Sequence, residues 1–325
     1  MSDFPPAQRI KSNGISLCVH QAGPKHGLPV LLLHGWPELA RSWKHQIGPL
    51  AAAGFRVIAP DMRGFGGSDA PKAVSAYGID TLVADMTGLL DALGHERAVW
   101  AGHDWGGLVV WPAALLAPDR VCGVIGVNTP HLPRPPLSPL DLLVQRFGED
   151  HYFNRFQEEG LAESALEGRE DDFFAFIFAR PPERPSRRLP KGVPPGMTHL
   201  LKRFAEFTGR DEALIAVPAA ERAHYAAAYR RSGFRGGINY YRNVTANWRR
   251  MDGVDLTVRQ PALMIGAELD PFLPPGFMDG MEERVPDLQK HVIKGCGHWT
   301  QWEAADALAR LMIAWLRKRQ QDLTS

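Results

Sequence analysis

The chain has little cysteine, with three in 325 residues. Cys18, Cys122 and Cys296 are few, odd in number and far apart, which argues against a disulfide framework and favours a reducing compartment. The sequence also has no Cys-x-x-Cys pair and no His-Glu-x-x-His segment, the spacings typical of zinc sites. We therefore expect neither a metal ion nor another cofactor.

A strong charge of one sign and a long apolar run are also absent. Lys and Arg number 37 and Asp and Glu 36, a net charge of +1 that does not suggest the basic surface of a nucleic-acid-binding protein. No uninterrupted apolar run could span a bilayer, and the N-terminus lacks the basic and then apolar pattern of a signal peptide. We expect a cytoplasmic protein without nucleic-acid or membrane partners, and leave open whether it forms a homodimer.

Apolar patterning predicts an α/β protein with one insertion. After a hairpin signal at Asn13-Gly14, strand-like and helix-like runs alternate to about residue 129 and resume at Ala262, which is typical of a doubly wound, mostly parallel sheet. Between these two alternating regions the strand-like runs stop, and the sequence pattern predicts helices. We predict a core of residues 1–131 and 251–325 with a helical lid of residues 132–250. The Pro- and Arg-rich stretch 180–196 predicts an extended connection within this lid.

A carboxylate stands where a tight elbow would expose a nucleophile. Gly102-His103-Asp104-Trp105-Gly106-Gly107 lies between a short and a longer apolar run, the pattern of strand, elbow and helix. Such an elbow commonly carries Gly-x-Ser-x-Gly, which this chain lacks throughout. A carboxylate attacking an ester would give only a reactive anhydride, so we expect Asp104 to attack saturated carbon and form an alkyl-enzyme ester that water then cleaves. The alternative is an aspartate that caps the helix.

Two further residues in the order of a catalytic triad favour the nucleophile. Asp270 follows the apolar run 262–265 and His298 follows 291–293, so both lie just beyond the carboxyl ends of predicted strands, where open parallel sheets bind ligands. One histidine alone would more often be structural, since the chain has 12. Nucleophile, acid and histidine in this order predict that His298 deprotonates the water while Asp270 holds its tautomer.

His34-Gly35-Trp36-Pro37, directly after the apolar run 30–33, completes the predicted site. In this arrangement the backbone N–H groups of Trp36 and Trp105 would form an oxyanion hole. Trp36-Pro37 is also a candidate for a cis bond. The alternative is an ordinary turn at Pro37.

With these pieces in place, the chain resembles the epoxide hydrolases of the α/β-hydrolase fold, of the soluble epoxide hydrolase type. The shared motifs span nearly the whole chain and include residues 34–37, 61–68, 102–107, 128–130, 232–236, 241–243 and 297–301. The resemblance implies two lid tyrosines that hydrogen-bond the epoxide oxygen. The family's pattern around Phe156-Gln157-Glu158 places the first at Tyr152, and Tyr241-Arg242-Asn243 places the second at Tyr241.

Tyrosines suit an epoxide better than a halide. An opened epoxide releases an alkoxide whose conjugate acid has a pKa of about 15.7, whereas a phenol has a pKa of about 10 and stays protonated at neutral pH. A departing halide needs no proton. The sequence therefore predicts conversion of epoxides to diols, although helical spacing would also suit Tyr241 as a core aromatic.

Two other functions remain as alternatives. A haloalkane dehalogenase would use the same aspartate, with the indole N–H of Trp105 on the halide, and a non-enzymatic relative would only bind a ligand. The tyrosines argue against the first and the complete triad against the second. The residues predicted to contact substrate are Trp36, His103, Trp105, Phe156 and Trp299.

Overall fold

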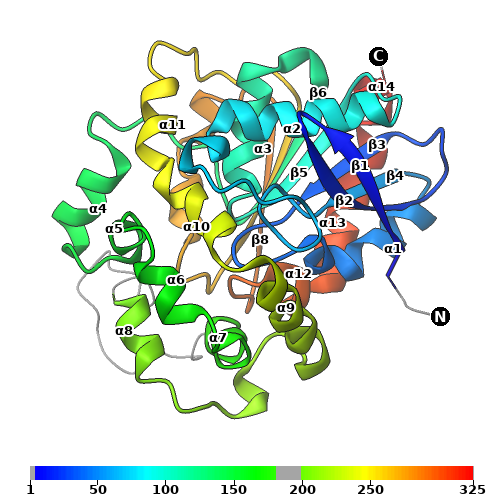
Figure 1. The fold of residues 1–325 in the computed structure, drawn as a ribbon. Helices are drawn as coiled ribbons and strands as arrows, with labels where there is room; N and C mark the ends of the chain where they lie inside the picture. Colours follow the sequence, from blue (N-terminus) through cyan, green and yellow to red (C-terminus); the bar gives the residue numbers. More distant parts are fainter. Residues whose placement is uncertain (1–3, 181–198, 325) are drawn as a thin grey trace.

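The computed structural model describes residues 4–180 and 199–324, and its centre is an eight-stranded sheet of order β1-β2-β4-β3-β5-β6-β7-β8 (Figure 1). The strands are β1 (Ala7–Ser12), β2 (Ile15–Ala22), β3 (Pro29–Leu33), β4 (Arg56–Pro60), β5 (Ala98–His103), β6 (Val121–Val127), β7 (Ala262–Ala267) and β8 (Leu288–Ile293). β2 pairs antiparallel with β1 and β4, and the other pairs are parallel. The predicted α/β architecture is therefore confirmed.

The hairpin predicted at the N-terminus joins β1 to β2. Asn13 and Gly14 both have positive φ angles, 44° and 77°, and Ser12 pairs with Ile15 across the turn. Two such residues give the turn a twist that matches the twist of the flanking strands.

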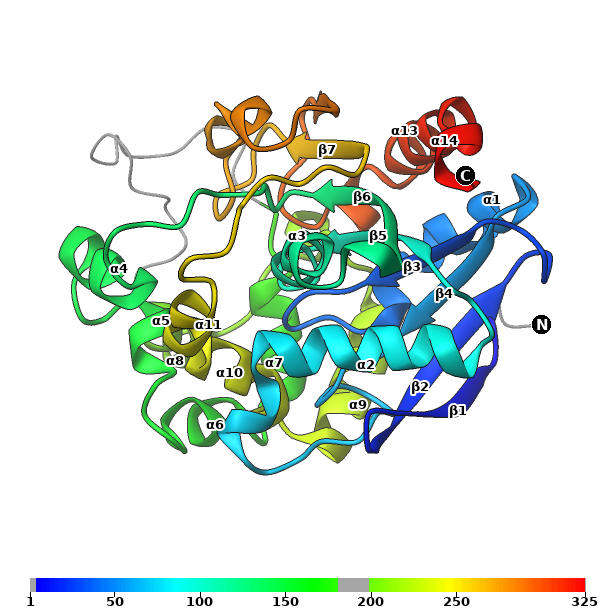
Figure 2. The same cartoon turned by 90° about the horizontal axis from the view of Figure 1, so that it is seen from above.

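Helices cover both faces of the sheet because the central strands are apolar on both faces. Along β3, Leu31 and Leu33 belong to one buried cluster while Val30 and Leu32 belong to the other. Figure 2 shows α2 on one side of the sheet and α13 on the other. The helices of the core are α1 (Lys44–Ala52), α2 (Ile79–Ala92), α3 (Gly107–Leu116), α12 (Thr300–Glu303), α13 (Ala305–Lys318) and α14 (Gln320–Thr324), and its 3₁₀ turns are Ala40–Trp43, Val74–Tyr77, Pro118–Arg120, Pro275–Met278 and Met281–Glu283.

A helical segment separates β6 from β7, and we call residues 132–250 the helical insertion. Its helices are α4 (Pro139–Phe147), α5 (Tyr152–Arg155), α6 (Leu161–Leu166), α7 (Glu170–Ile177), α8 (Leu200–Ala205), α9 (Ala219–Ser232), α10 (Arg235–Arg242) and α11 (Val244–Arg250), with a 3₁₀ turn at Glu212–Leu214. In Figure 1 they run from green to yellow along one side of the molecule. The extended connection predicted at 180–196 lies, from residue 181 onward, outside the described residues.

Glycines let the insertion dock directly on the core. A Cβ on Gly236 of α10 would lie 2.3 Å from the carbonyl oxygen of Gly64, and one on Gly237 would lie 2.6 Å from the indole of Trp36. The hydroxyl of Tyr240 donates to the carbonyl of Arg63 at 3.0 Å. The backbone of α10 is thereby held against the loop that follows β4. Among the described residues, no helix combines the length and the apolar character needed to cross a membrane.

Candidate active site

Asp104 occupies a sharp turn between β5 and α3, with a φ of 51°. This left-handed conformation is uncommon for a residue with a Cβ, and it persists only where the surroundings impose it. The neighbours impose it here: a Cβ on Gly102 would lie 2.3 Å from the carbonyl of Gly106, and one on Gly106 would lie 2.2 Å from the carbonyl oxygen of Leu33. The glycines thus allow the elbow to close tightly and present the Asp104 side chain.

Two backbone N–H groups hold the Asp104 carboxylate. Oδ1 accepts the N–H of Trp36 at 2.8 Å, and the N–H of Trp105 also bonds to the carboxylate. Burial raises the pKa of Asp104, while His298 and these two donors act to lower it. The structure therefore brings both predicted oxyanion-hole donors to the nucleophile. The Trp36-Pro37 peptide bond is cis.

His298 lies between two carboxylates. Its Nδ1 is 2.9 Å from Oδ2 of Asp270, and its Nε2 is 3.9 Å from Oδ2 of Asp104. Burial alone would lower the pKa of His298, but Asp270 above all raises it to about 9. Since Asp270 accepts at Nδ1, Nε2 is the nitrogen directed at the nucleophile. The three residues predicted as a triad are thus in one cluster.

Asn128 orients Asp270, a contact that the sequence interpretation missed. Its Nδ2 donates to Oδ2 of Asp270 at 2.6 Å, and its Oδ1 accepts the hydroxyl of Thr300 at 2.8 Å. The other oxygen of Asp270 accepts the N–H groups of Phe272 and Leu273. Burial acts to raise the pKa of Asp270, but His298 and these donors lower it. The available signal was the position of Asn128, which directly follows β6 as Asp104 follows β5.

His103 does not contact the cavity, contrary to its prediction as a substrate-binding residue. The side chain is fully buried, and its ring lies 4.8 Å from that of His298, measured between centroids. Its Nε2 donates to the carbonyl of His298 at 2.8 Å, and its Nδ1 lies 3.0 Å from Oε2 of Glu38. The physical reason is the elbow, which turns Asp104 toward the cavity and leaves its neighbour at the end of β5. Glu38 was missed because no local pattern marks a buried partner for His103.

Glu303 fixes the loop that carries His298. Its two carboxylate oxygens accept the N–H groups of Gly297 at 3.1 Å and of Trp299 at 3.0 Å, one on each side of the histidine. Burial raises the pKa of this carboxyl group. The loop is therefore tied on both sides of His298 to the last residue of α12.

Both predicted tyrosines lie at the same cavity as the nucleophile. This cavity has a volume of about 20 Å³ and is lined by Trp36, Asp104, Tyr152, Ile177, Leu200, Tyr241, Phe272, His298 and Trp299. The rings of Tyr152 and Tyr241 lie edge to face with their centroids 5.5 Å apart, and the ring of Tyr241 lies 4.9 Å from that of Trp105. Burial, with Asp104 as a further cause, raises the pKa of both phenols well above the usual value, so both keep their protons. A volume of this size holds about one water molecule, so an organic substrate requires lining side chains to move.

The remaining predicted contact residues divide into two groups. Trp36 and Trp299 line the cavity. Phe156 lies outside the lining and packs its ring 5.4 Å from that of Trp36 and 5.0 Å from that of Tyr241, measured between centroids. The ring of Trp105 packs 4.9 Å from Tyr241 and borders a different pocket.

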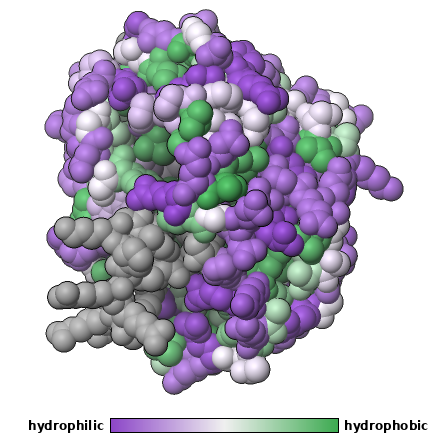
Figure 3. Space-filling model, turned by 90° about the vertical axis from the view of Figure 1, so that its left-hand side faces the viewer, coloured by the Kyte–Doolittle hydropathy of each residue, from purple (hydrophilic) through white to green (hydrophobic). Residues whose placement is uncertain are grey.

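That second pocket is larger and almost entirely apolar. Its volume is about 200 Å³, and side chains of α3, of residues 130–135 and of α11 line it, among them Leu108, Leu132 and Trp248. Figure 3 views the molecule from the side on which α4 and α11 lie in Figure 1, and hydrophobic side chains gather there between polar ones. Neither Asp104 nor His298 lines this pocket, and both line the smaller cavity.

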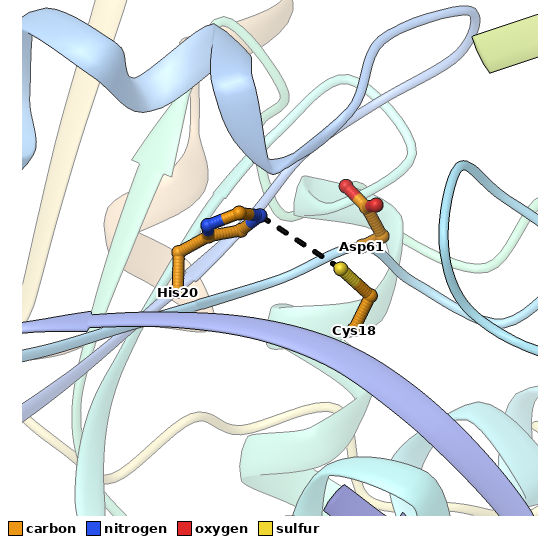
Figure 4. Close-up of side chains that lie close together, drawn as sticks. All are labelled: Cys18, His20 and Asp61. Atoms are coloured by element: carbon orange, nitrogen blue, oxygen red, sulfur yellow. Dashed lines mark hydrogen bonds between the residues drawn. The ribbon is translucent and has the colours of Figure 1, made fainter. Parts of the chain in front are cut away.

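A cysteine, a histidine and an aspartate lie together away from this cavity, on β2 and just after β4 (Figure 4). Their potential ligand atoms are all within 4.8 Å of one another. However, the Asp61 oxygens accept the N–H groups of Ala40 and Gly67, and burial together with Asp61 raises the pKa of Cys18 to about 12. A thiol must lose its proton to bind a metal. Hydrogen bonds within the protein therefore account for the cluster of Cys18, His20 and Asp61.

Comparison with known proteins gives a consistent result. Residues 29–305 match the family model of the alpha/beta hydrolase fold. The chain is 40% identical to epoxide hydrolase A of Mycobacterium tuberculosis, over 96% of this chain and 97% of that protein. It is 38% identical to bifunctional epoxide hydrolase 2 of Sus scrofa over 89% of this chain, and it spans 51% of that longer relative. The crystal structure of epoxide hydrolase A from Mycobacterium thermoresistibile superposes with a TM-score of 0.85 at 39% identity, covering 96% of this chain and 98% of that one.

Proposed function

The chain belongs to the epoxide hydrolases of the α/β-hydrolase fold, and from this membership we propose that it converts epoxides to vicinal diols through a covalent ester on Asp104. One observation carries the mechanism: a carboxylate at the elbow shares one small cavity with an imidazole and two protonated phenols. A carboxylate can attack carbon, and phenols can assist an oxygen leaving group.

In the first half-reaction Asp104 attacks an epoxide carbon. A bond forms between the carboxylate oxygen and that carbon while the ring C–O bond breaks. The ring oxygen accepts hydrogen bonds from Tyr152 and Tyr241 and takes a proton from one of them. The two phenols support an epoxide rather than a halide, since an alkoxide leaving group needs a proton and a departing halide needs none.

In the second half-reaction water attacks the carboxyl carbon of the ester. His298 removes one water proton, Asp270 stabilises the imidazolium, and the N–H groups of Trp36 and Trp105 bind the oxyanion. The bond between the carboxyl carbon and the diol oxygen then breaks, the diol oxygen takes the remaining proton of the added hydroxyl, and Asp104 is again a carboxylate. The proton taken by His298 replaces the one that the phenol gave to the product, so the resting state is restored. Esterification also removes the negative charge of Asp104, which is one of the causes that raise the pKa of His298. The pKa of His298 therefore falls in the ester, and more of the imidazole is neutral and able to act as a base.

We further propose that the helical insertion (residues 132–250) is a lid on a core of residues 1–131 and 251–325. Tyr152, Ile177, Leu200 and Tyr241 supply one side of the cavity, and the core supplies the other. Helical lids often exclude water and contribute substrate contacts. The three cysteines are free thiols, which supports a location in the reducing cytoplasm.

Single turnover in ¹⁸O-labelled water tests the proposal. With enzyme in excess over epoxide, the first diol takes its new oxygen from Asp104, so it should carry no label, while one Asp104 oxygen becomes labelled. Peptide mass spectrometry locates that label. Labelled diol in the first turnover would show direct attack by water and would overturn the covalent route.

A further inference from the structure

The two phenols of the cavity come from different segments of the helical insertion. Tyr152 begins α5, whereas Tyr241 lies near the end of α10. Their ring centroids are 5.5 Å apart. Two donors can act on one epoxide oxygen only while these segments keep a fixed separation.

Arg242, the residue after Tyr241, joins the two segments. Its side chain is only 3% exposed. Nε donates to the carbonyl of Phe156 at 2.9 Å, and Nη2 donates to the carbonyl of Glu158 at 3.2 Å. Nη1 and Nη2 bind the two oxygens of Glu163 at 2.7 and 3.0 Å. All three partner residues belong to the segment that starts with Tyr152 and runs through α5 and α6.

A bond from Nη1 to Oδ1 of Asn239 on its own helix, at 3.0 Å, completes the set. A guanidinium has five N–H groups, and each of them has an acceptor here. The planar fork is the reason that arginine suits this place, since a lysine ammonium has three donors and cannot bind a carboxylate in the same bidentate way.

A second contact ties the same two segments at Tyr241 itself. The side-chain amide of Gln157 donates to the carbonyl of Tyr241 at 3.0 Å and to the carbonyl of Phe153 at 2.8 Å. The ring of Phe156 packs on both tyrosines, with centroid distances of 5.4 and 5.0 Å. Aromatic packing leaves rings free to slide, whereas the arginine bonds fix backbone carbonyls.

We propose that Arg242 is a positioning residue that sets the separation of the two phenols above Asp104, and so controls formation of the ester without affecting its hydrolysis. The inference rests on the proposed function, because it assumes that both phenols assist ring opening. It assigns the arginine no contact with the substrate.

The test is Arg242→Lys, followed by transient kinetics that measure ester formation and ester hydrolysis separately. Lysine keeps the charge beside Glu163 but loses the fork. We expect ester formation to slow by roughly 10–100-fold, the order of effect that a displacement of about 1 Å can have. Hydrolysis should stay within about twofold, because His298, Asp270 and the N–H donors lie on the core. Equal slowing of both steps would overturn the proposal.

Arg169→Lys is the matched control. Arg169 also binds one carboxylate, that of Asp172, and two backbone carbonyls, those of Phe204 and Phe207, within the helical insertion. These contacts do not involve the segments that carry the tyrosines. The control should leave both steps unchanged, and slowing of ester formation to the same extent would show a general effect of loosening the insertion.

A combined variant separates failure of this inference from failure of the proposed function. If Arg242 acts by placing the phenols, Arg242→Lys should cost much less in a Tyr241→Phe background than in the wild type. The same loss in both backgrounds would refute positioning. Tyr152→Phe and Tyr241→Phe, single and combined, test the role of the phenols on their own. If Arg242→Lys does not fold, judged by near-ultraviolet circular dichroism, Glu163→Gln replaces one of the two acceptor oxygens by an NH₂ group, so it removes one of the five bonds and should slow the same step by a smaller factor.

Discussion

The core and the helical insertion hold their proposed catalytic groups in different ways. Asp104, Asp270 and His298 each lie in the loop after a parallel strand, and N–H groups close in space fix their carboxylates or loops. Tyr152 and Tyr241 lie on helices, and side chains from a distant segment hold them together. The nucleophile therefore depends on local backbone geometry, whereas the phenols depend on how two helical segments meet.

This difference also divides the chemistry. In the proposed mechanism the core carries every group needed for hydrolysis of the ester, and the insertion carries the groups that assist ring opening. Substitutions in the core should affect formation of the ester, its hydrolysis or both. Substitutions in the insertion should affect only formation of the ester, through the assistance to ring opening. The predictions below test that division, starting with the largest effect.

Asp104→Ala should abolish turnover, because no other group in the cavity can attack carbon. The loss should be roughly 10⁶-fold, the order found when a hydrolase loses its nucleophile. Initial rates on an epoxide, with circular dichroism to show that the variant is folded, measure it. Asparagine is a poorer replacement, since the site can deamidate it. Retained activity would show that the core does not supply the nucleophile.

His298→Gln should leave ester formation intact and nearly stop hydrolysis. Glutamine cannot remove the proton of the attacking water, and general-base catalysis contributes typically 10²–10⁴-fold. Intact-mass spectrometry should therefore show enzyme plus substrate accumulating. If substrate binds and no adduct forms, His298 acts in the first step and the division between the two regions fails.

The double change Tyr152→Phe and Tyr241→Phe should have the complementary effect. Phenylalanine keeps the ring packing but removes the donor, so ring opening should slow by roughly 10²–10⁴-fold. Either single change should leave measurable activity, because the phenols partly replace one another. Any side activity on an alkyl halide should depend less on the tyrosines. Wild-type rates of epoxide opening in the double variant would make the tyrosines packing residues only.

The sequence was sufficient for the core because its signals are local. An apolar run followed by a turn residue marks Asp104, Asp270 and His298, and parallel strands bring such loops to one edge of the sheet. Asn128 was missed because its role appears only where loops from different strands meet, and Glu303 was missed because no pattern in the sequence shows that its side chain folds back onto the N–H groups of Gly297 and Trp299. For the same reason His103 was wrongly predicted to contact the substrate, because the direction of its side chain depends on the geometry of the elbow.

In the insertion the tyrosines could be predicted only through family motifs. Helical spacing around Tyr241 fits a core aromatic equally well, and nothing in the motif around Arg242 indicates which carbonyls it binds. Those contacts depend on the packing of α5 and α6 against α10. Physical pattern alone therefore predicts the nucleophile and its base, and tertiary structure is needed for the arrangement of the donors.

The pH dependence should also differ between the two regions. In the resting enzyme the pKa of His298 is about 9, and loss of the Asp104 charge in the ester lowers it. Hydrolysis needs the neutral imidazole, so its rate should rise with pH and level off, with a midpoint below about 9. The phenols, with pKa values raised by burial, stay protonated throughout this range. Single-turnover rates across pH check this, and a hydrolysis midpoint above 9 would contradict the proposed release of the base.

The smallest effect should come from Glu303→Gln in the core. The Glu303 carboxylate accepts two N–H groups, whereas glutamine offers one acceptor oxygen and one NH₂ donor. The NH₂ would face a backbone N–H, which is also a donor, so one hydrogen bond is lost and the His298 loop loosens. We expect hydrolysis to slow by roughly 3–10-fold, less than the typical 10²–10⁴-fold value of a general base, because the imidazole keeps its bond to Asp270.

Glu268→Gln is the matched control for that change. Glu268 also accepts a loop N–H, that of Gly295, but it is exposed and lies outside the cavity. It should leave both steps unchanged. Ester formation measured on the same samples decides whether the effect of Glu303 is confined to the base. If Glu303→Gln slowed ring opening as much as hydrolysis, the His298 loop would support Asp104 as well as the base. The two steps would then not be separable within the core. The division between core and insertion could still hold.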